Sequence, residues 1–138
     1  MSHSNADTIT HLYELAAASK NEEMFGLINE ILAPDVVLRE ATSLPFGGTF
    51  EGKANVLQAL GAVMPFVDSS KLVPERILSD GDVVVALFQA VHWRAEGFTT
   101  HGVEVPAPTN FLEVWRFRDG KVVELQPWYF DQATVPKI

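Results

Sequence analysis

The spacing of apolar residues divides the chain into helical segments, which come first, and segments with the alternation of β-strands. In three segments the apolar residues recur every three or four positions, which places them on one face of a helix. We therefore predict helices over Asp7–Ser19, Glu22–Leu32 and Gly52–Met64. Asp7 or Thr8 can cap the first helix by accepting backbone N–H bonds.

Strand patterns dominate the second half of the chain. A short β-branched run, Val36–Glu40, precedes them, and a proline and two glycines in Leu44–Phe50 indicate a loop. Asp119-Gly120 is a strong signal for a two-residue hairpin turn. The alternation predicts strands over Lys71–Leu78, Val83–Arg94, Thr109–Arg118 and Lys121–Asp131, with His101–Pro108 as a connection.

Helices followed by an antiparallel meander indicate an α+β fold, with the helices packed on one face of the sheet. At 138 residues the chain has the length of one domain, and we assign residues 1–138 to it. A sheet that curls around three helices leaves a cone whose interior can hold a ligand.

Strand parity predicts which side chains face that interior. On Thr109–Arg118, three aromatic residues share a face with Glu113, and burial among them should raise the pKa of this carboxyl. In the last strand neither set of alternate residues is cleanly apolar. On Val83–Arg94 we expect the bulkier set to face the helices: Val83, Val85, Leu87, Gln89, Val91 and Trp93.

The opposite face of the sheet is also apolar in this reading. It would carry Ala86, Phe88 and Ala90 on one strand, and Leu112 and Val114 on another. An exposed apolar patch of this kind is commonly covered by a second copy of the chain. We therefore expect a homodimer through the outer face of the sheet.

Charge and composition exclude several classes of function. The net charge of −8 disfavours nucleic acids and anionic membranes as partners, and no apolar run reaches the ~20 residues of a membrane helix. The chain has no cysteine, which excludes disulfides and thiolate nucleophiles and fits a cytoplasmic location. His92 and His101 match no zinc-ligand spacing, so we expect no metal site.

Four segments carry a combination of residues that is typical of a known superfamily. They are the helix with Tyr13, Pro34–Glu40, Pro45–Gly52, and Val114–Glu124 followed by Trp128–Asp131. Together they resemble the NTF2-like superfamily and, within it, the SnoaL-like polyketide cyclases and ketosteroid isomerases. The resemblance implies a cone in which three helices pack on a strongly curved, mostly antiparallel sheet.

The resemblance also implies roles for individual residues. Tyr13 falls on the isomerase tyrosine that donates a hydrogen bond to the oxyanion, and Glu113 on its second, protonated donor. Glu40 falls on the general base at the end of the first strand, and Asp131 on the acid/base aspartate late in the last strand of the cyclases. Glutamate replaces aspartate at both isomerase positions, so each carboxyl reaches one methylene further.

Two functions remain open at this stage. The first is a cofactor-independent enzyme that isomerises, cyclises or dehydrates an apolar carbonyl compound, with Glu40 or Asp131 as base and Tyr13 and Glu113 as donors. The second is a non-catalytic module that binds a small ligand. In either case we expect the ligand to contact Gln89, Trp93, Phe111, Trp115 and Tyr129.

Each candidate residue also has a purely structural interpretation. Tyr13 would be a core tyrosine, Glu40 an exposed strand-end residue and Asp131 a solvated chain end, while Glu113 would form an ion pair with Arg39 or Arg94.

Overall fold

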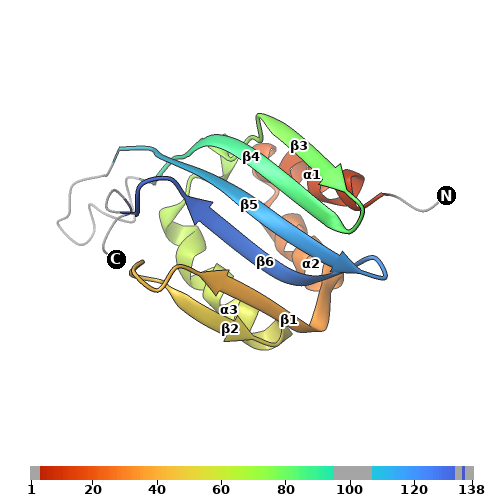
Figure 1. The fold of residues 1–138 in the computed structure, drawn as a ribbon. Helices are drawn as coiled ribbons and strands as arrows, with labels where there is room; N and C mark the ends of the chain where they lie inside the picture. Colours follow the sequence, from red (N-terminus) through yellow and green to blue (C-terminus); the bar gives the residue numbers. More distant parts are fainter. Residues whose placement is uncertain (1–3, 95–106, 133–134, 136–138) are drawn as a thin grey trace.

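Three helices cover one face of a six-stranded sheet in the computed structural model, which describes residues 4–94, 107–132 and 135 (Figure 1). This arrangement confirms the predicted α+β fold. The helices are α1 (Asn5–Ala17), α2 (Asn21–Ile31) and α3 (Lys53–Val63), with short 3₁₀ turns at Met64–Phe66 and Ser69–Lys71. The strands are β1 (Leu32–Glu40), β2 (Gly48–Glu51), β3 (Arg76–Asp80), β4 (Val83–Val91), β5 (Thr109–Arg118) and β6 (Lys121–Tyr129).

The strand order β2-β1-β6-β5-β4-β3 places the first strand beside the last. β1 and β6 run parallel, whereas the other neighbouring strands pair antiparallel. The β5–β6 hairpin turns at Asp119 and Gly120, which both have positive φ (51° and 77°), as the sequence predicts for this dipeptide. Because β6 lies between β1 and β5, side chains of these three strands can meet on the inner face of the sheet.

The core lies between the helices and this inner face. α1 presents Ile9, Leu12 and Ala16 to it, each at most 2% exposed, and the sheet contributes Trp115 and Leu125.

Helix α1 begins with a capping box at Ser4, in which the Asp7 backbone N–H donates to Ser4 Oγ at 3.0 Å. The prediction that Asp7 or Thr8 is the cap was therefore wrong, because the N-cap is Ser4 and Asp7 is the N3 residue of the box.

Several predicted boundaries differ from the structure: β1 begins at Leu32 rather than Val36, β4 ends at Val91 rather than Arg94, and β6 ends at Tyr129 rather than Asp131. The end of the predicted loop, Gly48–Phe50, forms the edge strand β2 together with Glu51, since the backbone of this segment pairs with β1 from Val37 to Glu40. The close turn before it requires glycine, because a Cβ at Gly47 would lie 2.0 Å from the Ala41 carbonyl oxygen. The predicted strand Lys71–Leu78 begins only at Arg76, after the second 3₁₀ turn.

The predicted orientation of β4 was wrong along its first half. Val84, Ala86 and Phe88 are at most 4% exposed and face the helices, whereas Gln89 is exposed. The register with β5 shifts between Phe88 and Val91, and this irregularity returns Val91 to the inner face. Residue size could not identify the inner set because both faces of β4 carry apolar side chains.

The correction changes the predicted dimer surface. Ala86 and Phe88 are core residues, so they cannot belong to an exposed patch. Leu112 and Val114 do lie on the outer face and are half-buried in the single chain. No helix among the described residues has the length and apolar character needed to cross a membrane.

Candidate active site

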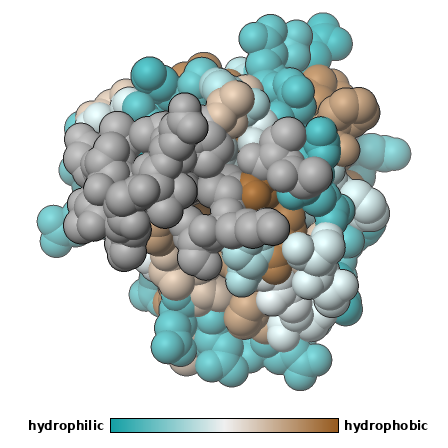
Figure 2. Space-filling model, turned by 90° about the vertical axis from the view of Figure 1, so that its left-hand side faces the viewer, coloured by the Kyte–Doolittle hydropathy of each residue, from teal (hydrophilic) through white to brown (hydrophobic). Residues whose placement is uncertain are grey.

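A pocket of about 90 Å³ lies between α3 and the inner face of the sheet. It is near the end of the molecule at which β1 and β6 finish, where hydrophobic side chains reach the surface between hydrophilic ones (Figure 2). Two carboxyl groups interrupt an otherwise mainly apolar wall. The described residues that line the pocket are Leu38, Glu40, Phe46, Phe50, Ala59, Leu60, Val63, Met64, Val67, Leu72, Val91, Phe111, Glu113, Pro127 and Tyr129.

Sheet register brings the two carboxyls into one row. Glu113 on β5 pairs with Pro127 on β6, and Leu38 on β1 pairs with Leu125 on β6. Continuing the parallel β1–β6 register by two residues places Glu40 level with Pro127. Neighbouring strands lie ~4.8 Å apart, so the Cα atoms of Glu40 and Glu113 are separated by about 10 Å, and both side chains enter the same pocket.

Glu113 is held from the helix side by Tyr13. The Tyr13 hydroxyl donates to Glu113 Oε1, and Tyr13 itself is only 5% exposed on the buried stripe of α1. Burial among apolar side chains raises the pKa of Glu113 to about 8. Near neutral pH the carboxyl is thus mostly protonated and retains a proton that it can donate.

Glu40 enters the pocket from the end of β1. Its Oε2 atom is buried and has no hydrogen-bond partner among the described residues. Burial raises the pKa of Glu40 to about 8 as well. A buried carboxyl oxygen without a donor is costly to maintain, and groups of this kind often have a functional explanation.

Tyr129 lies close to both carboxyls. Burial, and then the negative charges of Glu40 and Glu113, raise its pKa well above the usual value. Its ring stacks on Phe111 (centroids 5.5 Å apart) and meets Phe46 edge to face at 6.1 Å. Phe111 also stacks on Phe88, with their ring centroids 4.7 Å apart. The rings of Tyr129, Phe111 and Phe88 therefore form a continuous stacked row.

The structure brings together four of the residues predicted from sequence. Glu40, Glu113, Phe111 and Tyr129 line the pocket, and Tyr13 contacts Glu113 from behind. The ion pair considered for Glu113 does not use Arg39, which instead lies 3.5 Å from Glu124 on the outer face.

Four other predicted residues lie outside the pocket lining. Gln89 is exposed, and Asp131 is exposed just after β6. Trp93 is buried, with its indole N–H donating to Thr109 Oγ1 at 3.3 Å. Trp115 is 2% exposed and belongs to the core between the helices and the inner face of the sheet.

Sequence reasoning missed the far wall of the pocket. Phe46 and Phe50 come from the segment predicted as a loop, and Leu60, Val63 and Met64 belong to the segment predicted as the third helix. A usable signal was present, since α3 carries more apolar residues than one buried stripe needs and only Val56 on it is buried. The apolar side chains of α3 that are not needed for the buried stripe form this wall of the pocket.

Metal chemistry has no evident ligand set in the part of the chain that the structure describes. No group of three or more His, Asp or Glu side chains lies close enough together there to hold an ion.

The raised pKa of Glu113 is directly measurable. We expect the side-chain carboxyl carbon of Glu113 to titrate near pH 8 in an NMR experiment, because its burial disfavours the charged form. A Glu113 midpoint near 4.5 would contradict the buried, neutral acid described here.

Comparisons with known proteins agree on the architecture. An NTF2-like protein of unknown function from Burkholderia pseudomallei K96243 has 23% identity and a TM-score of 0.69, with 95% of this chain and 94% of that chain covered. An NTF2-like protein from Burkholderia thailandensis E264 has 14% identity and a TM-score of 0.74, with 97% and 95% covered. A Sinorhizobium meliloti protein proposed to be a polyketide cyclase has 16% identity and a TM-score of 0.59, with 88% and 94% covered.

These likenesses establish the fold alone, because all three identities are below 25%. No curated protein sequence matches the chain significantly. The family comparison is more direct, since residues 9–125 match the SnoaL-like domain. The chain therefore belongs to the SnoaL-like domain family, within the NTF2-like fold.

Proposed function

We propose that this protein is a cofactor-independent enzyme that moves a proton next to the carbonyl group of a small, largely apolar compound. The observation that supports it best is the pairing of two carboxyls in one apolar pocket, each with a pKa of about 8. Groups that titrate close to the working pH can both accept and donate protons. The reaction class includes isomerisation, cyclisation and dehydration.

The two carboxyls would have different roles. When the first proton leaves the pair, the resulting charge opposes loss of the second, so one acid and one base coexist over a range of pH. Glu40 is the base, because its Oε2 has no described partner and is free to accept a proton. Glu113 is the donor, because burial raises its pKa to about 8 and the Tyr13 hydroxyl, which donates to Oε1, leaves the other oxygen for the ligand.

The chemical step then follows from these positions. Glu40 removes a proton from the carbon next to the carbonyl, the electron pair of that C–H bond forms the C=C bond of an enolate, and the π pair of the carbonyl moves onto its oxygen. Glu113 stabilises the developing oxyanion by hydrogen bonding. Glu40 returns the proton to a second carbon in an isomerisation. In a cyclisation the enolate carbon attacks a second carbonyl group of the substrate, whose oxygen takes the proton. In a dehydration the enolate expels a β-hydroxyl group, which takes the proton and leaves as water.

A non-catalytic binding module remains the second candidate. The Tyr13–Glu113 hydrogen bond favours it, because a module is expected to satisfy its own polar groups. The unpartnered oxygen of Glu40 favours the enzyme, since a carboxyl that accepts a substrate proton needs an oxygen that no internal donor occupies.

Proton exchange distinguishes the two candidates without knowledge of the natural substrate. A panel of small cyclic and aryl ketones is incubated with the protein in D₂O, and the α-proton signals are followed by NMR. We expect at least one ketone to exchange faster with the wild type than with Glu40→Gln. A ketone that raises the melting temperature but shows no enhanced exchange would favour the binding module.

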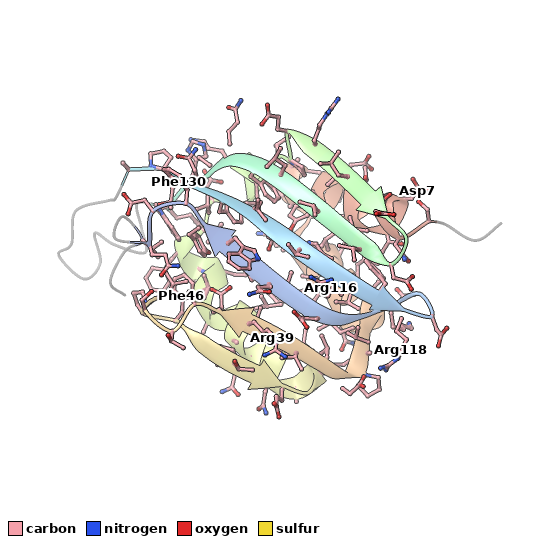
Figure 3. All side chains as sticks on the ribbon, in the orientation of Figure 1. Asp7, Arg39, Phe46, Arg116, Arg118 and Phe130 are labelled. Atoms are coloured by element: carbon pink, nitrogen blue, oxygen red, sulfur yellow. The ribbon has the colours of Figure 1, made fainter. Side chains whose placement is uncertain are left out.

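We also propose that the protein forms a homodimer through the outer face of the sheet. Arg39 and Arg116 lie on this face, which is turned toward the viewer in Figure 3, and both approach Glu124. Beside them lies a patch of apolar side chains on four strands. It consists of Leu78 and Trp128, which are 46% and 54% exposed, and half-buried Val85, Leu87, Leu112 and Val114.

Light scattering tests the dimer. We expect a mass of twice the 15.2 kDa of one chain at micromolar concentration, because pairing removes this patch from water. Leu112→Lys should give the monomer mass, whereas Gln58→Lys on exposed α3 surface should stay dimeric. A wild-type monomer would refute the proposal.

A further inference from the structure

The pocket contains acids and aromatic rings but no basic side chain among the described residues that line it. Its titratable groups there are Glu40, Glu113 and Tyr129, and Tyr13 contacts it indirectly through Glu113. The described lining is therefore neutral when both carboxyls are protonated and negative once one of them ionises. A ligand carboxylate or phosphate would find no cation among these lining residues to offset its desolvation.

Glu40 provides a specific contact for a donor. Glu40 lines the pocket, and its buried Oε2 accepts no hydrogen bond from any described side chain. A neutral carbonyl oxygen cannot satisfy an ionised carboxylate, because both groups are acceptors. An ammonium group supplies both the N–H donors and the opposite charge, which makes its hydrogen bond to carboxylate one of the stronger kinds.

The rest of the pocket suits the other parts of such a ligand. Phe46, Phe50, Phe111 and Tyr129 contribute aromatic rings, whose faces attract organic cations when water is excluded. The wall formed by Leu60, Val63 and Met64 suits a hydrocarbon group next to the charged nitrogen. The site thus offers a carboxylate, ring faces and an apolar wall within one small volume.

We propose that this pocket binds lipophilic amines as ammonium ions, with the ligand nitrogen donating to Glu40 Oε2 and the proton of Glu40 released to solvent. The inference rests on the proposed function only in taking this pocket as the ligand site, and it needs no turnover. Glu113 remains protonated in the complex, because ionised Glu40 opposes a second negative charge nearby.

The proton balance gives the proposal a characteristic signature. Below pH 8 the free protein holds the Glu40 proton, so binding of an ammonium ion ionises Glu40 and releases up to one proton. Above pH 8 Glu40 is already ionised and the release falls toward zero. A neutral ligand releases no proton at either pH.

Calorimetry with three single-ring probes tests this at pH 7. Benzylamine, benzyl alcohol and benzoate have similar shapes but positive, zero and negative charge. We expect benzylamine to bind at least tenfold more tightly than benzyl alcohol, and benzoate most weakly. Titrations in two buffers of different ionisation enthalpy should show proton release with benzylamine alone.

Glu40→Gln should remove both the preference for benzylamine and the proton release, whereas Glu51→Gln, a control on the exposed neighbouring strand β2, should retain them. Equal or weaker binding of benzylamine relative to benzyl alcohol, no binding of either probe, or an unchanged preference in Glu40→Gln would overturn the inference. If benzylamine binds as expected while no ketone exchanges its protons, the amine site stands and the proposed enzyme activity fails.

Discussion

Replacing Glu40 with glutamine is expected to lower the turnover of a carbonyl substrate by roughly 10²–10⁴-fold, the contribution typical of a positioned general base. The amide keeps the shape of the side chain but has no basic oxygen to accept the substrate proton. The fold should tolerate it, because Oε2 has no described hydrogen-bond partner to lose. Turnover can be followed by NMR on a ketone that exchanges with the wild type, and circular dichroism verifies the fold.

Asp131→Asn is the matched comparison. The likeness to the cyclases gave Asp131 the acid/base role, but the structure places it in an exposed position outside the pocket lining. We therefore expect Asp131→Asn to change turnover by less than about threefold, within the range of a distant surface substitution. A severe loss in Asp131→Asn with a mild one in Glu40→Gln would reverse our assignment of the base.

Tyr13→Phe should have an intermediate effect, because Tyr13 acts through Glu113 rather than on the ligand. Its hydroxyl stabilises the ionised form of Glu113, so its removal should raise the pKa of that carboxyl further. The alkaline limb of the pH–rate profile should then move to higher pH. If turnover falls but both limbs of the pH–rate profile keep their position, Tyr13 has a packing role instead.

The regular part of the sheet explains which site residues could be predicted from sequence. The alternation of side chains between the two faces of the sheet predicted correctly that Glu113 points inward, because this alternation is uninterrupted in β5 from Phe111 to Trp115. The same reasoning failed for Gln89, because the register with β5 shifts just beyond Phe88 and both faces of β4 are apolar. A local shift in strand register of this kind cannot be recognised from the order of apolar and polar residues in the sequence.

Contacts across the fold were harder to derive from the pattern alone. Tyr13 and Glu113 are 100 residues apart, and neither periodicity nor composition pairs them. The family resemblance placed both at the site but as parallel donors to the ligand, whereas the structure has Tyr13 donating to Glu113. The edge strand β2 was missed because Gly47 and Gly48, which its tight entry requires, are also the signature of a loop.

The two pocket carboxyls should also make the protein less stable as pH rises. In the unfolded chain each ionises near pH 4.5, but in the folded protein each holds its proton until about pH 8. The folded state therefore holds more protons on these two groups between these values, so their contribution to stability is greatest below about pH 4.5 and falls as pH rises to 8. At ~1.4 kcal/mol for each pKa unit, the loss for one carboxyl is on the order of 3 kcal/mol by pH 7.

Glutamine removes this cost because it has no proton to lose. We expect Glu113→Gln to unfold at a higher urea concentration than the wild type at pH 8, with the advantage shrinking toward pH 5. The Tyr13 hydroxyl can still donate to the amide oxygen at position 113, so the folded contact survives. Glu51→Gln, an exposed control, should follow the wild type at each pH. If the curves of Glu113→Gln and the wild type run parallel from pH 5 to 8, Glu113 is not a neutral acid in the folded protein, and its role as proton donor falls with it.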